Sequence, residues 1–171
     1  MGTLEFSVIL VYNVGKGSDN VYIKYIDSPI GILRIDSDGR AITEVATVAC
    51  RGSVENADTL CEDMTKWLQA YFSGACAPCG VPLDPIGTEF QRKIWSTLLD
   101  LPYGVTATYG EVALRAGFPK ACRAVGSAVG KNPILVAIPC HRVLSSKGLG
   151  GFTALGGVET KKKLLKLENV I

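Results

Sequence analysis

The sequence predicts an α+β protein in which an N-terminal β-sheet domain precedes a mainly helical C-terminal domain with a helix-turn-helix. Three observations support this prediction. Segments rich in β-branched and aromatic residues alternate with turn residues over roughly the first 50 positions, which is typical of strands. Helical spacing of apolar residues begins near residue 56 and returns after residue 88. Residues 74–87 hold three prolines and three glycines, so we expect domains over residues 1–78 and 84–171.

The N-terminal domain is expected to contain strands and one helix. Runs rich in Val, Ile and Tyr, bracketed by glycine, proline and aspartate turns, predict strands over residues 4–12, 21–26, 32–35 and 42–49. A helix is expected over residues 56–72, because large apolar side chains recur there on one side. Gly74 is placed to end this helix.

The C-terminal domain is expected to begin with a helix over residues 89–99, capped by Thr88. A short helix over residues 109–116 ends at a glycine, and Pro119 suits the first turn of a helix over residues 120–129. Two short helices about a glycine turn predict a helix-turn-helix. The second helix carries mostly small side chains. Its composition fits close approach to a narrow DNA groove and, equally well, tight packing in a core.

Charge is distributed unevenly along the chain. Residues 1–85 carry 6 Lys+Arg against 11 Asp+Glu, a net charge of −5, whereas residues 86–171 carry 12 against 5, a net charge of +7. A basic half is expected of a surface that binds phosphate groups. The alternative is a solvated charged face, and we expect the run from Lys161 to Lys163 to lie on such a helix surface.

No stretch approaches the roughly 18 consecutive apolar residues of a membrane helix, so we expect an intracellular protein. Six cysteines in such a protein do not indicate disulfides. Cys76 and Cys79 form a Cys-x-x-Cys pair, but the chain has one histidine and no second such pair to complete a zinc site. Incidental thiols are the favoured interpretation, and no metal site is predicted.

The run from Ile138 to Val143, Ile-Pro-Cys-His-Arg-Val, places Cys140 beside the one histidine, His141. A thiol becomes a good nucleophile as the thiolate, so a nearby base must take its proton, and only this imidazole is available. Neighbours on an extended strand point to opposite faces, whereas Pro139 predicts a turn at which both side chains can reach one pocket. An isolated Cys-His pair is more often a buried hydrophobe beside a satisfied core histidine, so the surrounding residues must decide.

Further motifs accompany this pair from Tyr71 onward. They are Tyr71–Gly74, Gly87–Gln91, Tyr103–Ala113, Arg123–Gly126, Asn132-Pro133, Gly150–Phe152 and Lys163–Glu168. Together with Pro139–Arg142, their residues, order and spacing resemble the O6-alkylguanine-DNA alkyltransferases, also called methylated-DNA–protein-cysteine methyltransferases. The resemblance is strong from about Trp67 to Glu168 and weak over roughly the first 60 residues.

The resemblance implies a ribonuclease H-like N-terminal sheet domain and one reaction. An alkyl group passes from the O6 oxygen of guanine in DNA to Cys140, and the thioether is not turned over, so the protein is consumed. His141 is implied as the base, acting through a bridging water, and Glu168 as the carboxylate that orients it. Tyr109 is implied to donate a proton as guanine leaves, and Asn132 to brace the turn that holds the cysteine.

The resemblance also implies that the partner is double-stranded DNA carrying alkylated bases, approached from the minor groove, with the target base flipped out. Arg123 is implied to fill the gap that the flipped nucleotide leaves. The other expected DNA contacts are Lys120, Ala121, Ala124 and Lys131. The expected pocket residues are Val143, Gly151, Phe152 and Thr153. We further expect activity on O4-alkylthymine, no cofactor, no membrane contact, a monomer, and a cytoplasmic location, or a nuclear one in a eukaryote.

Other functions fit parts of the sequence. A cysteine hydrolase or acyltransferase could use Cys140, His141 and Glu168, but it needs an oxyanion hole and has no need of an arginine on a bare helix. A non-catalytic lesion-binding helix-turn-helix protein would replace the reactive cysteine, which this chain retains. An ordinary helix-turn-helix regulator would carry polar side chains on its second helix to read base edges.

Overall fold

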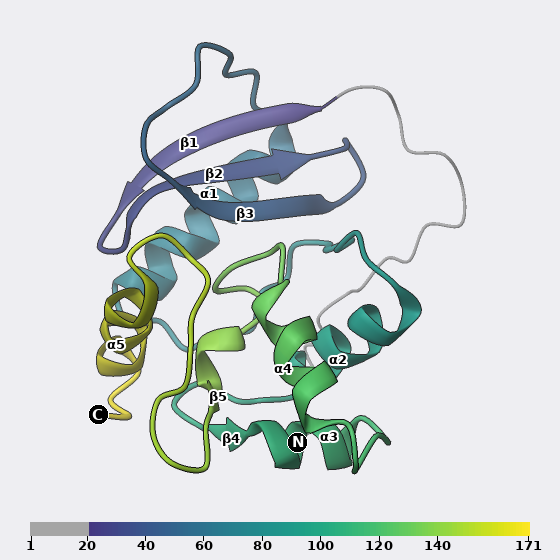
Figure 1. Ribbon diagram of the computed structural model, residues 1–171. Coiled ribbons are helices and arrows are strands. Elements are labelled where there is room, and N and C mark those ends of the chain that lie inside the picture. Colours follow the sequence, from purple (N-terminus) through teal and green to yellow (C-terminus); the bar gives the residue numbers. More distant parts are fainter. Residues whose placement is uncertain (1–20) are drawn as a thin grey trace, which may run out of the picture.

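The computed structural model describes residues 21–171, and its N-terminal domain is a three-stranded antiparallel sheet packed against one helix (Figure 1). The strands β1 (Tyr22–Ser28), β2 (Gly31–Ser37) and β3 (Ile42–Val48) lie in the order β1-β2-β3. They confirm three of the predicted strands, and the one predicted for residues 4–12 lies outside the described residues. The helix α1 (Thr59–Phe72) packs against all three strands.

The core of this domain comes from apolar residues that alternate along the strands. Ile35 of β2 pairs with Val45 of β3, and both side chains are fully buried, as are Met64 and Leu68 of α1. Burying one such side chain contributes roughly 1.5–3 kcal/mol to stability. Burial of these apolar side chains therefore holds the sheet and α1 together.

The ends of α1 follow from its capping residues. The helix begins later than the predicted residue 56, because the carboxylate of Asp58 caps it by accepting a hydrogen bond from the backbone nitrogen of Cys61 at 2.8 Å. It ends where predicted, and Gly74 follows with a φ of 92°, a left-handed conformation that glycine adopts without strain.

The C-terminal domain is mainly helical. Its elements are α2 (Glu89–Leu99), β4 (Ala107–Thr108), α3 (Tyr109–Arg115), α4 (Cys122–Gly130), the 3₁₀ helix η1 (Cys140–Arg142), β5 (Val143–Leu144) and α5 (Gly157–Leu167). Thr88 caps α2 as predicted, and its backbone nitrogen donates to the side-chain oxygen of Gln91 at 2.8 Å. The buried indole of Trp95 on α2 donates to the carbonyl of Ala128 on α4 at 2.9 Å. This contact ties α2 to the helix-turn-helix that α3 and α4 form.

The prediction that Pro119 opens the second helix of this motif was wrong. Residues 119–120 form a turn, and α4 begins at Cys122 after Ala121, which offers no side-chain cap. The backbone nitrogen of Ala121 donates to the carbonyl of Phe118 at 2.9 Å, so a tight turn takes up the residues that we assigned to the helix.

Of the two roles that the composition of α4 allowed, the structure shows tight packing in the core. One face packs into the core through Val125, Ala128 and Val129. The opposite face leaves Arg123 and Ala124 exposed. The small side chains of α4 therefore let one face pack closely in the core, while the other face exposes Arg123 among small residues.

Backbone hydrogen bonds join the two domains. The nitrogen of Val45 in β3 donates to the carbonyl of Pro133 at 2.9 Å, and the nitrogen of Leu135 donates to the carbonyl of Val45 at 2.8 Å. Farther along β3, the hydroxyl of Thr47 accepts from the nitrogen of Leu155 at 2.8 Å. Buried side chains from both domains form one continuous hydrophobic cluster. Within residues 21–171, no helix is long and apolar enough to cross a membrane.

Candidate active site

Cys140 and His141 lie in η1, a single 3₁₀ turn that follows Pro139, so the predicted turn is confirmed. Both side chains are buried. Asn132, just after α4, links to this turn: its side chain donates to the carbonyl of Ile138 at 2.8 Å and accepts from the nitrogen of Ile134 at 3.0 Å. The amide therefore bridges the start and the end of the segment that leads into η1.

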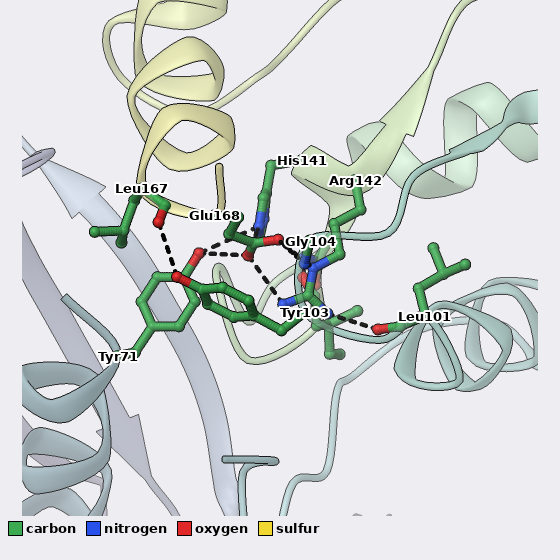
Figure 2. Close-up of polar contacts among 10 residues, drawn as sticks. Tyr71, Leu101, Tyr103, Gly104, His141, Arg142, Leu167 and Glu168 are labelled. Atoms are coloured by element: carbon green, nitrogen blue, oxygen red, sulfur yellow. Dashed lines mark hydrogen bonds and ion pairs between the residues drawn. The ribbon is translucent and has the colours of Figure 1, made fainter. Parts of the chain in front are cut away.

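His141 pairs with Glu168, the residue that ends α5 (Figure 2). The distance between His141 Nε2 and Glu168 Oε1 is 2.7 Å, and both side chains are completely buried. Burial lowers the pKa of His141, and this outweighs the Glu168 carboxylate, which raises it. The resting imidazole is therefore neutral, with its proton on Nε2, because a carboxylate can only accept. Nδ1 is buried and has no hydrogen-bond partner among the described residues, so its lone pair is open to a proton.

The Glu168 carboxylate is fixed by donors from several elements. Arg142 donates to it twice, from Nε and Nη2, both at 2.9 Å, and the nitrogen of Gly104 donates at 3.0 Å. The hydroxyl of Tyr71 donates to Oε1 at 2.7 Å. Burial alone would raise the pKa of Glu168, but the hydrogen bonds from His141, Arg142 and Tyr71 hold this pKa well below its usual range. The carboxylate is therefore charged and can stabilise an imidazolium.

Arg142 and Tyr71 were missing from the predicted site. Arg142 stood in the quoted Pro-Cys-His-Arg motif, so its position beside His141 could have suggested a role. Tyr71 lies 97 residues before Glu168 in the other domain, and no spacing rule connects the two.

A buried lysine lies close to the thiol. Lys161 is 0% exposed, which contradicts the helix surface that we predicted for it, although Lys163 is exposed. It lies three and four residues before the buried Leu164 and Leu165, on the apolar face of α5. Its ammonium donates to the carbonyls of Val143 at 2.6 Å and Leu149 at 2.5 Å. Burial lowers the pKa of Lys161 to about 8.

The pKa of the Cys140 thiol reflects opposing causes. Burial raises it, whereas a hydrogen bond from the Asn132 side chain and the charge of Lys161 lower it. A thiol in this position stays protonated at rest and depends on a neighbouring base to become a thiolate.

Tyr109 is the first residue of α3, and its ring lies between two glycines. A Cβ atom at Gly126 of α4 would lie 3.8 Å from the ring, and one at Gly150 would lie 3.3 Å from the hydroxyl. Burial raises the pKa of Tyr109, and the nearby Cys140 raises it further. Its hydroxyl therefore keeps a proton that it can donate.

The four predicted pocket residues occupy different environments. Val143 is fully buried in β5, and Phe152 is half-buried against the core. Gly151 and Thr153 are exposed, and the Thr153 hydroxyl donates to the carbonyl of Gly130 at 2.7 Å. This bond ties the segment after β5 to the end of α4.

The five predicted DNA contacts lie on or beside α4. Lys120, Arg123, Ala124 and Lys131 are exposed, and Ala121 is half-buried. Elsewhere, Cys76 is exposed and Cys79 is buried. Over residues 21–171, no group of His, Cys, Asp and Glu side chains could hold a metal ion.

Together, the fold and the site define a cysteine-nucleophile protein whose histidine–carboxylate pair lies beside a helix-turn-helix. Two family models match the chain. The ribonuclease-like domain of 6-O-methylguanine DNA methyltransferase matches residues 21–85, and the DNA binding domain of the same family matches residues 89–170.

Individual relatives agree with the family models. A methylated-DNA–protein-cysteine methyltransferase from Haemophilus influenzae is 43% identical over 159 residues, covering 88% of this chain and 87% of its own. One from Methanosarcina acetivorans is 39% identical over 155 residues, covering 86% and 98%. The crystal structure of Mycobacterium tuberculosis OGT in complex with DNA superimposes with a TM-score of 0.77 at 40% identity, covering 86% and 92%. The chain belongs to the 6-O-methylguanine DNA methyltransferase family.

Proposed function

We propose that this protein repairs DNA directly, by moving the alkyl group of O6-alkylguanine irreversibly and stoichiometrically to Cys140. The observation that carries the proposal is the placement of Cys140 next to the His141–Glu168 pair in the chain and close to Tyr109, the first residue of the helix-turn-helix. Family membership supports it, because the relatives are named as transferring methyl groups from DNA to a protein cysteine.

The reaction is a substitution at the alkyl carbon. The open Nδ1 of His141 takes the proton of Cys140 through a bridging water, and Glu168 stabilises the resulting imidazolium. The thiolate attacks the alkyl carbon, a carbon–sulfur bond forms, and the bond between that carbon and O6 breaks. Tyr109 donates its proton to the departing guanine. The proton on His141 returns through solvent to the Tyr109 oxygen, so the products are a thioether and guanine and the reaction balances without a cofactor. The stable thioether ends the protein's activity.

The target base must leave the duplex to reach the buried thiol. We infer that the exposed face of α4 approaches the minor groove, where small residues such as Ala121 and Ala124 allow close contact. Arg123 enters the stack in place of the flipped nucleotide. Lys120 lies just before α4 and Lys131 just after it; both are exposed, and they bind phosphate groups.

The extruded base is enclosed by Val143, Gly151, Phe152 and Thr153, of which Phe152 offers an aromatic surface for stacking. The same pocket chemistry accepts O4-alkylthymine, whose exocyclic alkyl oxygen is the equivalent leaving group. We further propose that the protein acts as a monomer in the cytoplasm, or in the nucleus of a eukaryote.

The test is exposure of the protein to duplex DNA carrying labelled O6-methylguanine. We expect each molecule to gain one methyl group, and peptide mapping to find it on Cys140. Cys140→Ser should bind DNA and transfer nothing, whereas Cys50→Ser, which changes an exposed cysteine outside the site, should transfer normally. Repeated turnover with release of label would instead support a cysteine hydrolase, and methylation at another residue would remove Cys140 as acceptor.

A further inference from the structure

The side chain of Tyr71 reaches from the N-terminal domain into the histidine–carboxylate pair (Figure 2). It lies in the last turn of α1 and is 3% exposed. Its hydroxyl oxygen lies 2.7 Å from Glu168 Oε1 and 3.3 Å from His141 Nε2. The hydroxyl therefore touches both groups that are proposed to activate the thiol.

Aromatic packing fixes the direction of this hydroxyl. The ring of Trp67 stacks on the Tyr71 ring at 5.7 Å between centroids and 24° between planes. Tyr103 meets it edge-on at 5.9 Å and 72°. Contacts on a face and an edge leave a buried ring little freedom to turn, so the oxygen stays beside His141.

The Tyr71 hydroxyl stays protonated. Burial and the neighbouring Glu168 raise the pKa of Tyr71 far above its usual range, so the phenol is never ionised in the native protein. Its hydrogen is directed at Glu168, and the lone pairs of its oxygen therefore face the Nε2–H of His141. The Nε2 proton thus has two acceptors, the Glu168 carboxylate and the Tyr71 oxygen.

We propose that Tyr71 is a positioning residue of the alkyl-transfer site, which keeps the proton of His141 on Nε2 and so presents Nδ1 to Cys140 as a base. This inference rests on the proposed function and deepens it, because it makes the N-terminal domain part of the reacting site. When His141 accepts the thiol proton, the imidazolium holds its Nε2–H between two oxygens, and the Tyr71 oxygen stabilises that charge.

The titratable and charged groups around His141 come from several elements. They are Tyr71 of α1, Cys140 and Arg142 of η1, Lys161 of α5 and Glu168 at the end of α5. Arg142 and Lys161 lower the pKa of His141 and so disfavour an imidazolium, whereas the Glu168 carboxylate raises it. The Tyr71 oxygen, 3.3 Å from Nε2, is the other group placed to stabilise the Nε2–H.

The test compares Tyr71→Phe with Tyr103→Phe. The control removes a hydroxyl at the same junction, one that donates to the carbonyl of Leu167 at 2.9 Å, whereas the hydrogen-bond partners of His141 are Tyr71 and Glu168. Methyl transfer from a duplex carrying O6-methylguanine should slow roughly tenfold in Tyr71→Phe, the effect of one hydrogen bond to a charged group. It should change by less than about twofold in Tyr103→Phe. Equal effects in the two variants would show that Tyr71 only supports the fold.

A second readout uses no DNA. Alkylation of Cys140 by iodoacetamide, followed by peptide mapping, reports the pH at which the thiol becomes reactive. We expect Tyr71→Phe to raise that midpoint by about one pH unit, because a less stable imidazolium takes the proton less readily. The one histidine of the chain makes a ring NMR titration unambiguous, and its pKa should fall in the same variant. An unchanged midpoint and an unchanged titration would overturn the assignment, even if transfer were slower.

The two proposals fail in different ways. If the native protein transfers no methyl group, the proposed function is wrong, whereas the iodoacetamide midpoint and the histidine titration still decide the role of Tyr71. If transfer occurs and these two measurements do not move, only the inference about Tyr71 is wrong.

Discussion

Replacing Lys161 with methionine tests whether a buried ammonium holds the segment around the reactive thiol. Methionine has a similar length and fits an apolar site, but it cannot donate a hydrogen bond. The substitution therefore leaves the carbonyls of Val143 and Leu149 without the donor that now lies 2.6 Å and 2.5 Å away, and it weakens the hold on Gly151 at 3.4 Å.

The expected loss of stability combines opposing effects. Each buried carbonyl that loses its partner costs about 1–3 kcal/mol. Removing the lysine also removes the cost of burying a charge, which is visible in the lowering of its pKa to about 8. We expect a net loss of about 2–3 kcal/mol in the free energy of unfolding. Because the charge of Lys161 lowers the pKa of Cys140, its loss should raise that pKa and slow transfer roughly tenfold.

The assays are urea unfolding and the rate of methyl transfer, each measured on Lys161→Met and Lys162→Met. Lys162 is the next residue along α5 and forms a surface ion pair with Glu159 at 2.6 Å, so its replacement should leave both quantities unchanged. If Lys161→Met unfolds at the same urea concentration as the native protein and transfers at the same rate, the three carbonyl contacts contribute nothing and our reasoning is refuted.

Three further outcomes are expected. Arg123→Ala should slow repair of duplex DNA by about tenfold or more and leave reaction with free O6-methylguanine base unchanged, since only the duplex requires base extrusion; equal slowing of both would exclude a role in flipping. The affinity for DNA should fall steeply with increasing salt concentration and show little sequence preference, because residues 86–171 carry a net charge of +7. An affinity independent of salt would contradict this. The Glu168 pKa is lowered on folding, so its contribution to stability is present above about pH 4.5 and is lost as pH falls. In Glu168→Gln, the free energy of unfolding measured in urea should no longer fall with decreasing pH for this reason. A pH dependence equal to that of the native protein would contradict the expectation.

Much of the fold could be predicted from local patterns. Runs rich in Val, Ile and Tyr between turn residues located β1, β2 and β3, and Thr88 marked the residue before α2. These features succeed because strand pleat and helix capping depend on residues close in sequence. The start of α4 was misplaced because the prediction used only the local preference of one residue. Pro119 suits a first helical turn, but a hydrogen bond between Ala121 and Phe118 closes a tighter turn there.

The chemistry of the site could be read from the chain only in part. The turn at Pro139 that holds Cys140 and His141 followed from the sequence, and the family resemblance pointed to Glu168. The burial of Lys161 did not follow from the sequence, because a run of three lysines is typical of a solvated helix surface. Only the folded structure shows that three backbone carbonyls accept hydrogen bonds from its ammonium.

The sequence by itself determined which residue can be the nucleophile and which imidazole can serve it. Only the tertiary structure decided how strongly that imidazole is held, because Tyr71 and Glu168 come from different domains and are separated by 97 residues. Contacts over such distances arise when the sheet domain docks on the helical domain through β3, and docking depends on buried surface and backbone pairing rather than on local propensity. The lowered pKa values of His141 and Glu168 are therefore properties of the folded interior, set by burial and by donors that the chain brings together only when it folds.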